Sequence, residues 1–150
     1  MKVEIRMNRG FADPALRAAI RQAARAALAA GSAAGDSSLT ILVAGDETIR
    51  SLNVRFLDTD APTDVLAFPA GEEPAGDEEG YLGDVVISLE TARRQAEVGG
   101  HAPAHEVQLL TVHGVLHLLG HDHAGPAEKA AMWAAQTAAL AALDNPLSPP

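Results

Sequence analysis

Residues 111–123 read TVHGVLHLLGHDH and contain four of the six histidines in the chain. His113 and His117 are four residues apart in a helical pattern, so both rings project from one face of a helix, one turn apart. Gly120 can adopt the left-handed conformation that ends a helix and turns the chain back. His123 follows three residues later, close enough to supply a third nitrogen. Three neutral imidazoles leave one tetrahedral position for water or substrate, which is typical of a catalytic zinc site.

The donor set favours one zinc ion per chain. Imidazole suits zinc, and the chain has no cysteine, which excludes sites built on sulfur; nickel, copper and iron also accept imidazole. The same histidine spacing occurs in metzincin peptidases, whose pattern is H-E-x-x-H-x-x-G-x-x-H. Gly114 stands where those enzymes have their general base, so a metallopeptidase is the less favoured alternative. Met132 is assigned to the core rather than to a Met-turn.

Composition limits the class of protein. The length of 150 residues suits one domain, and the aromatic content of 3% predicts an aliphatic, alanine-rich core. The absence of cysteine also excludes disulfide scaffolds and thiol catalysis. A net charge of -9 disfavours loose binding to polyanions. No apolar run approaches the roughly 20 residues of a membrane span, and the N-terminus does not resemble a signal peptide. We therefore expect a cytoplasmic protein.

Apolar periodicity and turn signals predict a single α+β domain over residues 1–150. We expect a small four-stranded mixed sheet packed with about five helices, with the metal site at the end of a central helix. Strands are expected at 3–6, 39–44, 64–68 and 82–88, and helices at 14–30, 47–57, 89–99, 104–119 and 127–143. Residues 70–80 are expected to form an exposed acidic loop, and residues 144–150 a frayed tail. The row Arg17, Arg21 and Arg25 is interpreted as a solvated helix face.

Residues 113–123, HGVLHLLGHDH, closely resemble the H-G-x-L-H-L-x-G-[YH]-D-H signature of the YbeY family. The resemblance extends beyond this motif. Leu52-Asn53 and residues 62–69, PTDVLAFP, resemble the family segments L-N and P-T-D-V-L-S-F-P. Residues 83–88, GDVVIS, resemble its G-D-I-x-I-S strand. Glu106 and the Glu128…Met132 pair also occur where the family has these residue types.

The resemblance implies a zinc-dependent endoribonuclease with ligands His113, His117 and His123. It further implies single-strand-directed hydrolysis of RNA phosphodiesters by metal-activated water, in 16S ribosomal RNA 3′-end processing and ribosome quality control. Implied partners are ribosomal RNA, the small ribosomal subunit, ribosomal proteins and an assembly GTPase. The family usually has an arginine at the position of Leu57, so no catalytic group beyond the zinc-bound water is assigned. A zinc-stabilised ribosome assembly factor that does not cleave RNA is the other alternative.

The remaining polar residues near the motif receive structural interpretations. Glu106 is expected to form a salt bridge, and Asp122 to stabilise the turn through backbone N–H groups. His121 is expected at the rim of the site rather than as a fourth ligand. His101 and His105 are expected to be exposed at the start of the metal-binding helix.

Overall fold

The computed structural model describes residues 1–71, 80–122 and 124–149. It contains four strands and five helices in the predicted order, each within two residues of its predicted bounds. The elements are β1 (Lys2–Met7), α1 (Pro14–Ala30), β2 (Ser38–Ala44), α2 (Asp46–Leu57), β3 (Val65–Pro69), β4 (Tyr81–Ser88), α3 (Leu89–Gly99), α4 (Pro103–Leu118) and α5 (Pro126–Ala142). The predicted α+β class is confirmed.

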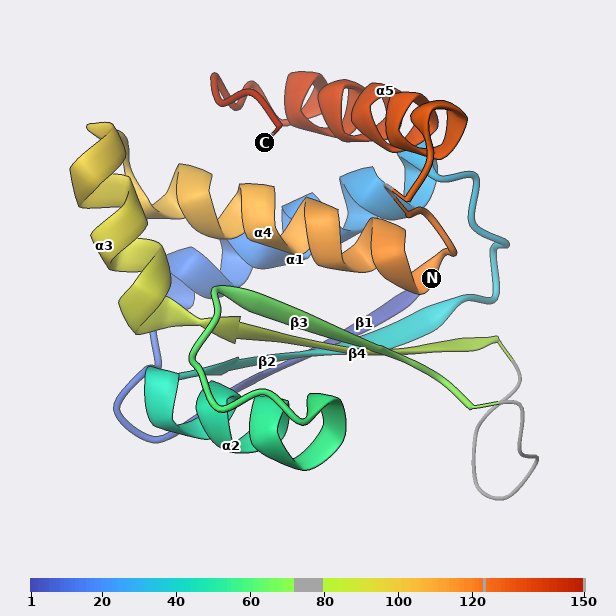
Figure 1. Cartoon of the computed structure of the whole chain (residues 1–150). Helices are drawn as coiled ribbons and strands as arrows, with labels where there is room; N and C mark the ends of the chain where they lie inside the picture. The colour runs from blue at the N-terminus through green and yellow to red at the C-terminus, as the bar shows by residue number, and fades with distance from the viewer. Residues whose placement is uncertain (72–79, 123, 150) are drawn as a thin grey trace.

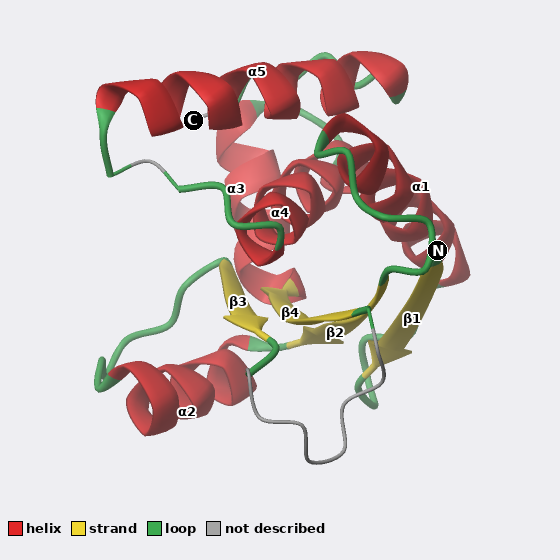
Figure 2. Cartoon of the chain, turned by 90° about the vertical axis from the view of Figure 1, so that its right-hand side faces the viewer, coloured by secondary structure: helices red, strands yellow, loops and turns green. Residues whose placement is uncertain are grey.

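The sheet is mixed, with strand order β1-β2-β4-β3. The first three strands in this order run parallel, and β3 pairs antiparallel with β4. Helices α1, α3, α4 and α5 lie over one face of the sheet, while α2 lies against the other face (Figure 1). Strands β1 and β3 are therefore the two edges, and β3 lies beneath α4 (Figure 2).

Helix α4 is the centre of the fold. It packs against the sheet on one side and against α1, α3 and α5 on others. Because it is enclosed in this way, its apolar residues point in almost every direction rather than along one stripe. Val107, Val112, Val115 and Leu116 are fully buried in the main core cluster. The predicted core residue Met132, on α5, belongs to the same cluster.

The arginine row of α1 is not simply a solvated face, contrary to the interpretation from sequence. Arg17 Nη1 donates to the backbone oxygen of Ile5 at 2.6 Å, and Arg21 Nη1 donates to that of Val3 at 2.7 Å. Both carbonyls lie on the side of β1 that faces away from β2. Since an open strand edge can template pairing with another chain, these arginines protect the edge of the sheet.

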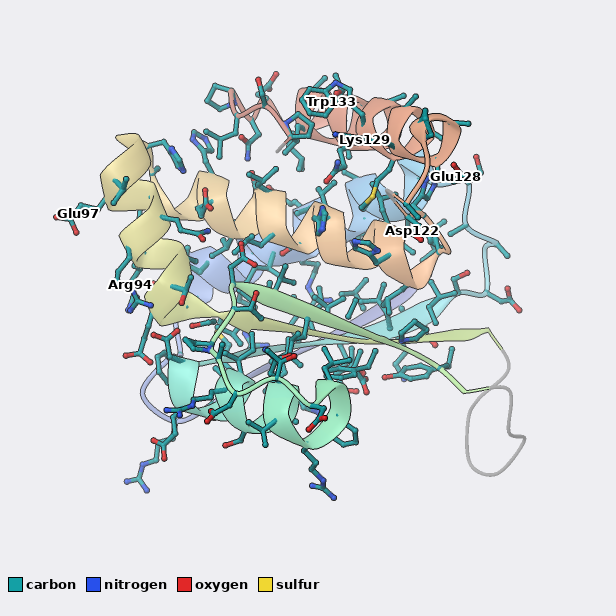
Figure 3. All side chains as sticks on the ribbon, in the orientation of Figure 1. Arg94, Glu97, Asp122, Glu128, Lys129 and Trp133 are labelled. Carbon is teal, nitrogen blue, oxygen red and sulfur yellow. The ribbon has the colours of Figure 1, made fainter. Side chains whose placement is uncertain are left out.

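Asp46 connects α2 to the elements that follow β4. Its carboxylate accepts hydrogen bonds from Ser88 Oγ and Thr91 Oγ1, both at 2.5 Å, and from Arg94 Nη2 at 2.7 Å; Arg94 is labelled on α3 in Figure 3. Partial burial raises the pKa of Asp46, but these hydrogen bonds and the charge of Arg94 outweigh it and lower the pKa below its ordinary value. The ionised carboxylate therefore stabilises the junction between α2 and α3.

Two predicted surface segments have different outcomes. Most of the acidic loop expected at 70–80 lies outside the described residues. The tail expected to fray from residue 144 is fastened to α4 at Asn145, which is 6% exposed. Asn145 Nδ2 donates to the backbone oxygen of His105 at 3.0 Å and to Gln108 Oε1 at 3.1 Å.

No helix in the described part of the chain is long and apolar enough to cross a membrane.

Candidate metal centre

His113 and His117 lie on consecutive turns of α4, and their Nε2 atoms are 3.1 Å apart. The ring centroids are 4.6 Å apart, with the planes inclined at 75°. Two imidazole nitrogens bound to one tetrahedral zinc at about 2.0 Å are separated by about 3.3 Å. The two Nε2 atoms thus have nearly the spacing that a shared zinc ion requires.

Gln136, on α5, fixes the orientation of the His113 ring. Its Oε1 lies 2.8 Å from His113 Nδ1, and the Gln136 side chain is buried at 4% exposure. Because an amide oxygen can only accept, Nδ1 carries the ring proton and Nε2 presents its lone pair toward His117. Metal-binding histidines usually donate their other ring nitrogen to such an acceptor. Sequence reasoning did not select Gln136.

The third predicted ligand, His123, lies outside the described residues. Within the described ranges, no three His, Cys, Asp or Glu side chains gather closely enough to hold a metal. The chain does turn back where expected, because Gly120 has a φ of +93° and its N–H donates to the backbone oxygen of His117 at 3.0 Å. Asp122 lies in the turn beyond α4 (Figure 3). The chemistry of the His113–Gln136–His117 arrangement fits zinc.

Gly114 allows α4 to lie directly on the sheet beside these histidines. A Cβ at Gly114 would be 2.7 Å from Val85 Cγ1 and 3.3 Å from Val65 Cγ2. Both valines belong to the strands beneath the helix, β4 and β3. The position therefore has no room for the glutamate of a metzincin peptidase.

Glu106 forms the salt bridge expected from sequence and also belongs to a larger network. Its Oε2 lies 2.7 Å from His101 Nε2, and its Oε1 accepts from Gln95 Nε2 at 2.7 Å. Gln95 Nε2 also lies 3.4 Å from Asp64 Oδ2. Glu106 is only 5% exposed, and the His101 side chain, expected to be exposed, is 20% exposed, because its hydrogen bond with Glu106 holds it against α4. His105, also expected to be exposed, is half-buried.

A cavity of about 610 Å³ lies between β3 and α4. Its α4 side is lined by Glu106, Leu109, Leu110, His113, Gly114 and His117. Residues 63–67 and Pro69 line its β3 side, and Gln95 of α3 also lines it. The cavity is large enough to hold a nucleotide-sized ligand. It therefore brings the two histidines together with a polar cluster and the outer strand of the sheet.

Comparison with known proteins identifies the family. The family model described as Endoribonuclease YbeY matches residues 3–144. An Endoribonuclease YbeY from a Nocardioides species is 46% identical over 111 residues, which cover 71% of this chain and 74% of the relative. The chain belongs to the YbeY family. An Endoribonuclease YbeY from Salinispora tropica is 45% identical over 115 residues, covering 70% of this chain and 73% of its own. The resemblance inferred from the motif is confirmed, as is the prediction of a family of RNA-hydrolysing enzymes.

A solved structure supports the YbeY fold assignment. The solution structure of TM1509 from Thermotoga maritima matches with a TM-score of 0.59 and 21% sequence identity. The match covers 96% of this chain and 93% of that protein. At this identity the likeness supports the fold alone.

Leu57, the position at which the resemblance to the family implies an arginine, does not line the described cavity. It is 52% exposed at the end of α2. Two nearby arginines do not replace the missing one. Arg50 Nε binds Asp60 Oδ1 at 2.6 Å, and the guanidinium carbon of Arg55 lies 5.2 Å from the centroid of the Phe56 ring.

We predict that Gly114→Ala lowers the free energy of unfolding by about 1–2 kcal/mol, because the added methyl overpacks the contact with Val85 by more than the gain in helix propensity. Gly35→Ala is the matched control, since a Cβ there meets nothing within 4 Å. Urea unfolding of both chelator-treated variants and the parent measures the effect. A Gly114→Ala protein at least as stable as the parent would contradict the packing argument.

Proposed function

We propose that this chain is a zinc-dependent endoribonuclease that cleaves single-stranded RNA, with zinc held by His113, His117 and His123. The observation that carries the proposal is the pair of Nε2 atoms that face each other across 3.1 Å at the wall of a cavity. Family membership supports RNA as the substrate, since the curated relatives are named Endoribonuclease YbeY.

A zinc ion at this site would supply a Lewis acid for the phosphodiester and lower the pKa of a water molecule toward neutrality. The residues of the chain prepare the site for it. Gln136 keeps the His113 ring in the tautomer that can bind a metal through Nε2. The Glu106–Gln95–Asp64 cluster, of which Glu106 is buried, places negative charge at one end of the cavity, so it disfavours phosphate there and leaves the histidine end for the reacting group.

In the cell, we place this activity in 16S ribosomal RNA 3′-end processing and ribosome quality control, in the cytoplasm. The chain carries a net charge of -9, whereas proteins that bind free RNA through charge are usually basic. A partner that presents the RNA resolves this contrast. The small ribosomal subunit, ribosomal proteins and an assembly GTPase are the proposed partners.

A zinc-stabilised assembly factor that binds ribosomal particles without cutting is the second candidate. None of the described residues that line the cavity is an arginine, and this favours it, because an arginine close to a scissile phosphate would stabilise charge that develops in the transition state. The exposed side chains of Val54, Phe56 and Leu57, which are 45%, 57% and 52% exposed, make the end of α2 apolar instead. A peptidase is disfavoured because the close contact of Gly114 with Val85 leaves no space for a catalytic glutamate.

We predict that zinc-loaded protein cleaves single-stranded ribosomal RNA and that His117→Ala abolishes cleavage, because it removes a metal ligand. His105→Ala, on the same helix but away from the cavity lining, is the control and should cleave like the parent. Gel analysis of RNA fragments, with all proteins purified identically, makes the comparison. Cleavage by His117→Ala would refute the assignment. Zinc binding and co-sedimentation with small subunits without cleavage would instead support the assembly factor.

Gln136→Leu should weaken zinc binding about 10- to 100-fold, because His113 loses the acceptor that fixes its tautomer. Gln22→Leu removes an exposed amide from α1 and should leave zinc affinity unchanged. Competition with a chromogenic chelator measures both affinities. Equal zinc affinity of Gln136→Leu and the parent would show that the hydrogen bond between Gln136 and His113 has no role in metal binding.

A further inference from the structure

Residues Val65, Ala67 and Pro69 of the edge strand β3 line the same cavity as the two histidines. The backbone oxygen of Asp64 accepts from Ser88 N, and Ala70 N donates to the backbone oxygen of Leu82, both at 2.9 Å. In an antiparallel ladder, residues alternate between those that bond to the partner strand and those that face away. These two bonds direct the backbone groups of residues 64, 66, 68 and 70 toward β4. The backbone groups of residues 65, 67 and 69 therefore point away from the sheet.

Leu66 indicates which face of β3 the cavity covers. Its side chain belongs to the small apolar cluster with Ile49 and Val86, which lies on the face of the sheet covered by α2. Leu66 nevertheless lines the cavity on the opposite side. Its backbone is therefore the part that reaches the cavity, so the cavity extends over β3 on the side of the sheet that faces α4.

This edge presents a short, specific pattern of hydrogen-bonding groups. The N–H of Val65 already donates to Asp64 Oδ1 at 2.8 Å, and Pro69 has no N–H. Of residues 65, 67 and 69, only Ala67 therefore has an N–H that points away from β4 and is available to a ligand. The carbonyl oxygens of Val65 and Ala67 lie on either side of this N–H. A peptide strand pairs through repeated donors and acceptors, and a single donor between two acceptors is too short for that.

The base of an unpaired nucleotide matches this pattern. Each RNA base carries a donor next to an acceptor on its Watson–Crick edge, and that edge is accessible only when the base is unpaired. Strand β3 and helix α4 run in the same general direction (Figure 1), and Asp64 and Glu106, which both hydrogen-bond to Gln95, mark the acidic end of the cavity. Ala67 lies further along β3, toward the end with His117.

We propose that the β3 edge at Ala67 binds the base of an unpaired nucleotide next to the cleaved phosphate, through the N–H of Ala67 and a flanking carbonyl oxygen. This inference rests on the proposed RNA substrate and extends it. The contact explains selection for single strands without selection for sequence, because every base offers a donor beside an acceptor. Ala67 is a positioning residue in this account, and its backbone rather than its side chain makes the contact.

Ala67→Pro tests the contact because it removes the N–H that faces away from β4 and leaves the hydrogen bonds to β4 in place; proline is tolerated on edge strands. Ala67→Ser keeps the N–H and is the control. With zinc-loaded protein and a labelled single-stranded RNA, Ala67→Pro should raise KM roughly 3- to 10-fold, the effect of one hydrogen bond. Ala67→Ser should leave KM near that of the parent.

RNAs with one abasic nucleotide at successive positions identify the base. The parent should lose affinity at one position, and Ala67→Pro should show no additional loss there, because both changes remove the same contact. Equal KM values for Ala67→Pro and Ala67→Ser would overturn the inference while leaving the ribonuclease assignment intact. Absence of RNA binding by the parent would overturn both. Cleavage of an unstructured peptide that Ala67→Pro abolishes would assign the edge to a peptide.

Hydrogen exchange at the Ala67 amide of the parent protein gives a second test that does not depend on the folding of Ala67→Pro. Addition of the single-stranded RNA should slow exchange at this amide more than at Ala70, whose N–H is already bound to Leu82. Unchanged exchange at Ala67 in the presence of bound RNA would overturn the inference.

Discussion

The contact between Gly114 and the valines beneath it is the constraint on which the candidate site depends. A central helix that is enclosed by three other helices and a sheet has little freedom to rotate or shift, because protein interiors are close-packed. With only a hydrogen atom at position 114, the helix lies directly on β3 and β4. The short distance between α4 and the sheet fixes the positions of the His113 and His117 side chains, which lie across the cavity from the edge strand β3. The same contact excludes the glutamate on which a peptidase of similar histidine spacing depends.

The second element of the site comes from α5. Gln136 reaches His113 from a helix that begins after the turn at Gly120, so the chain that leaves α4 returns to orient one of its histidines. The hydrogen bond is local in space but spans 23 residues in sequence. Formation of the site is thereby linked to the docking of α5, and loss of that docking would free the His113 ring to rotate.

The elements of the fold were predictable because turn signals mark their ends. Asp13-Pro14 begins α1, Gly45 precedes α2, and Pro69 ends β3, so the bounds agree with the structure within one or two residues. Contacts between residues far apart in the sequence were harder to predict. The arginines of α1 have a spacing typical of a solvated face, and only the position of β1 beside them shows that two bind its carbonyl oxygens. Gln136 did leave a signal: it interrupts the apolar stripe formed by Met132, Ala139 and Leu140 with a buried amide.

The central claim is that α4 and the turn after it present three imidazoles to one zinc ion. X-ray absorption at the zinc edge of the loaded protein tests it most directly, because the scattering pattern of imidazole rings reports how many are bound. The account predicts one zinc per chain with three imidazole nitrogens at about 2.0–2.1 Å, and loss of bound zinc when His113 and His117 are both replaced by alanine. A zinc ion with fewer imidazole ligands, or zinc retained by the double variant, would contradict it.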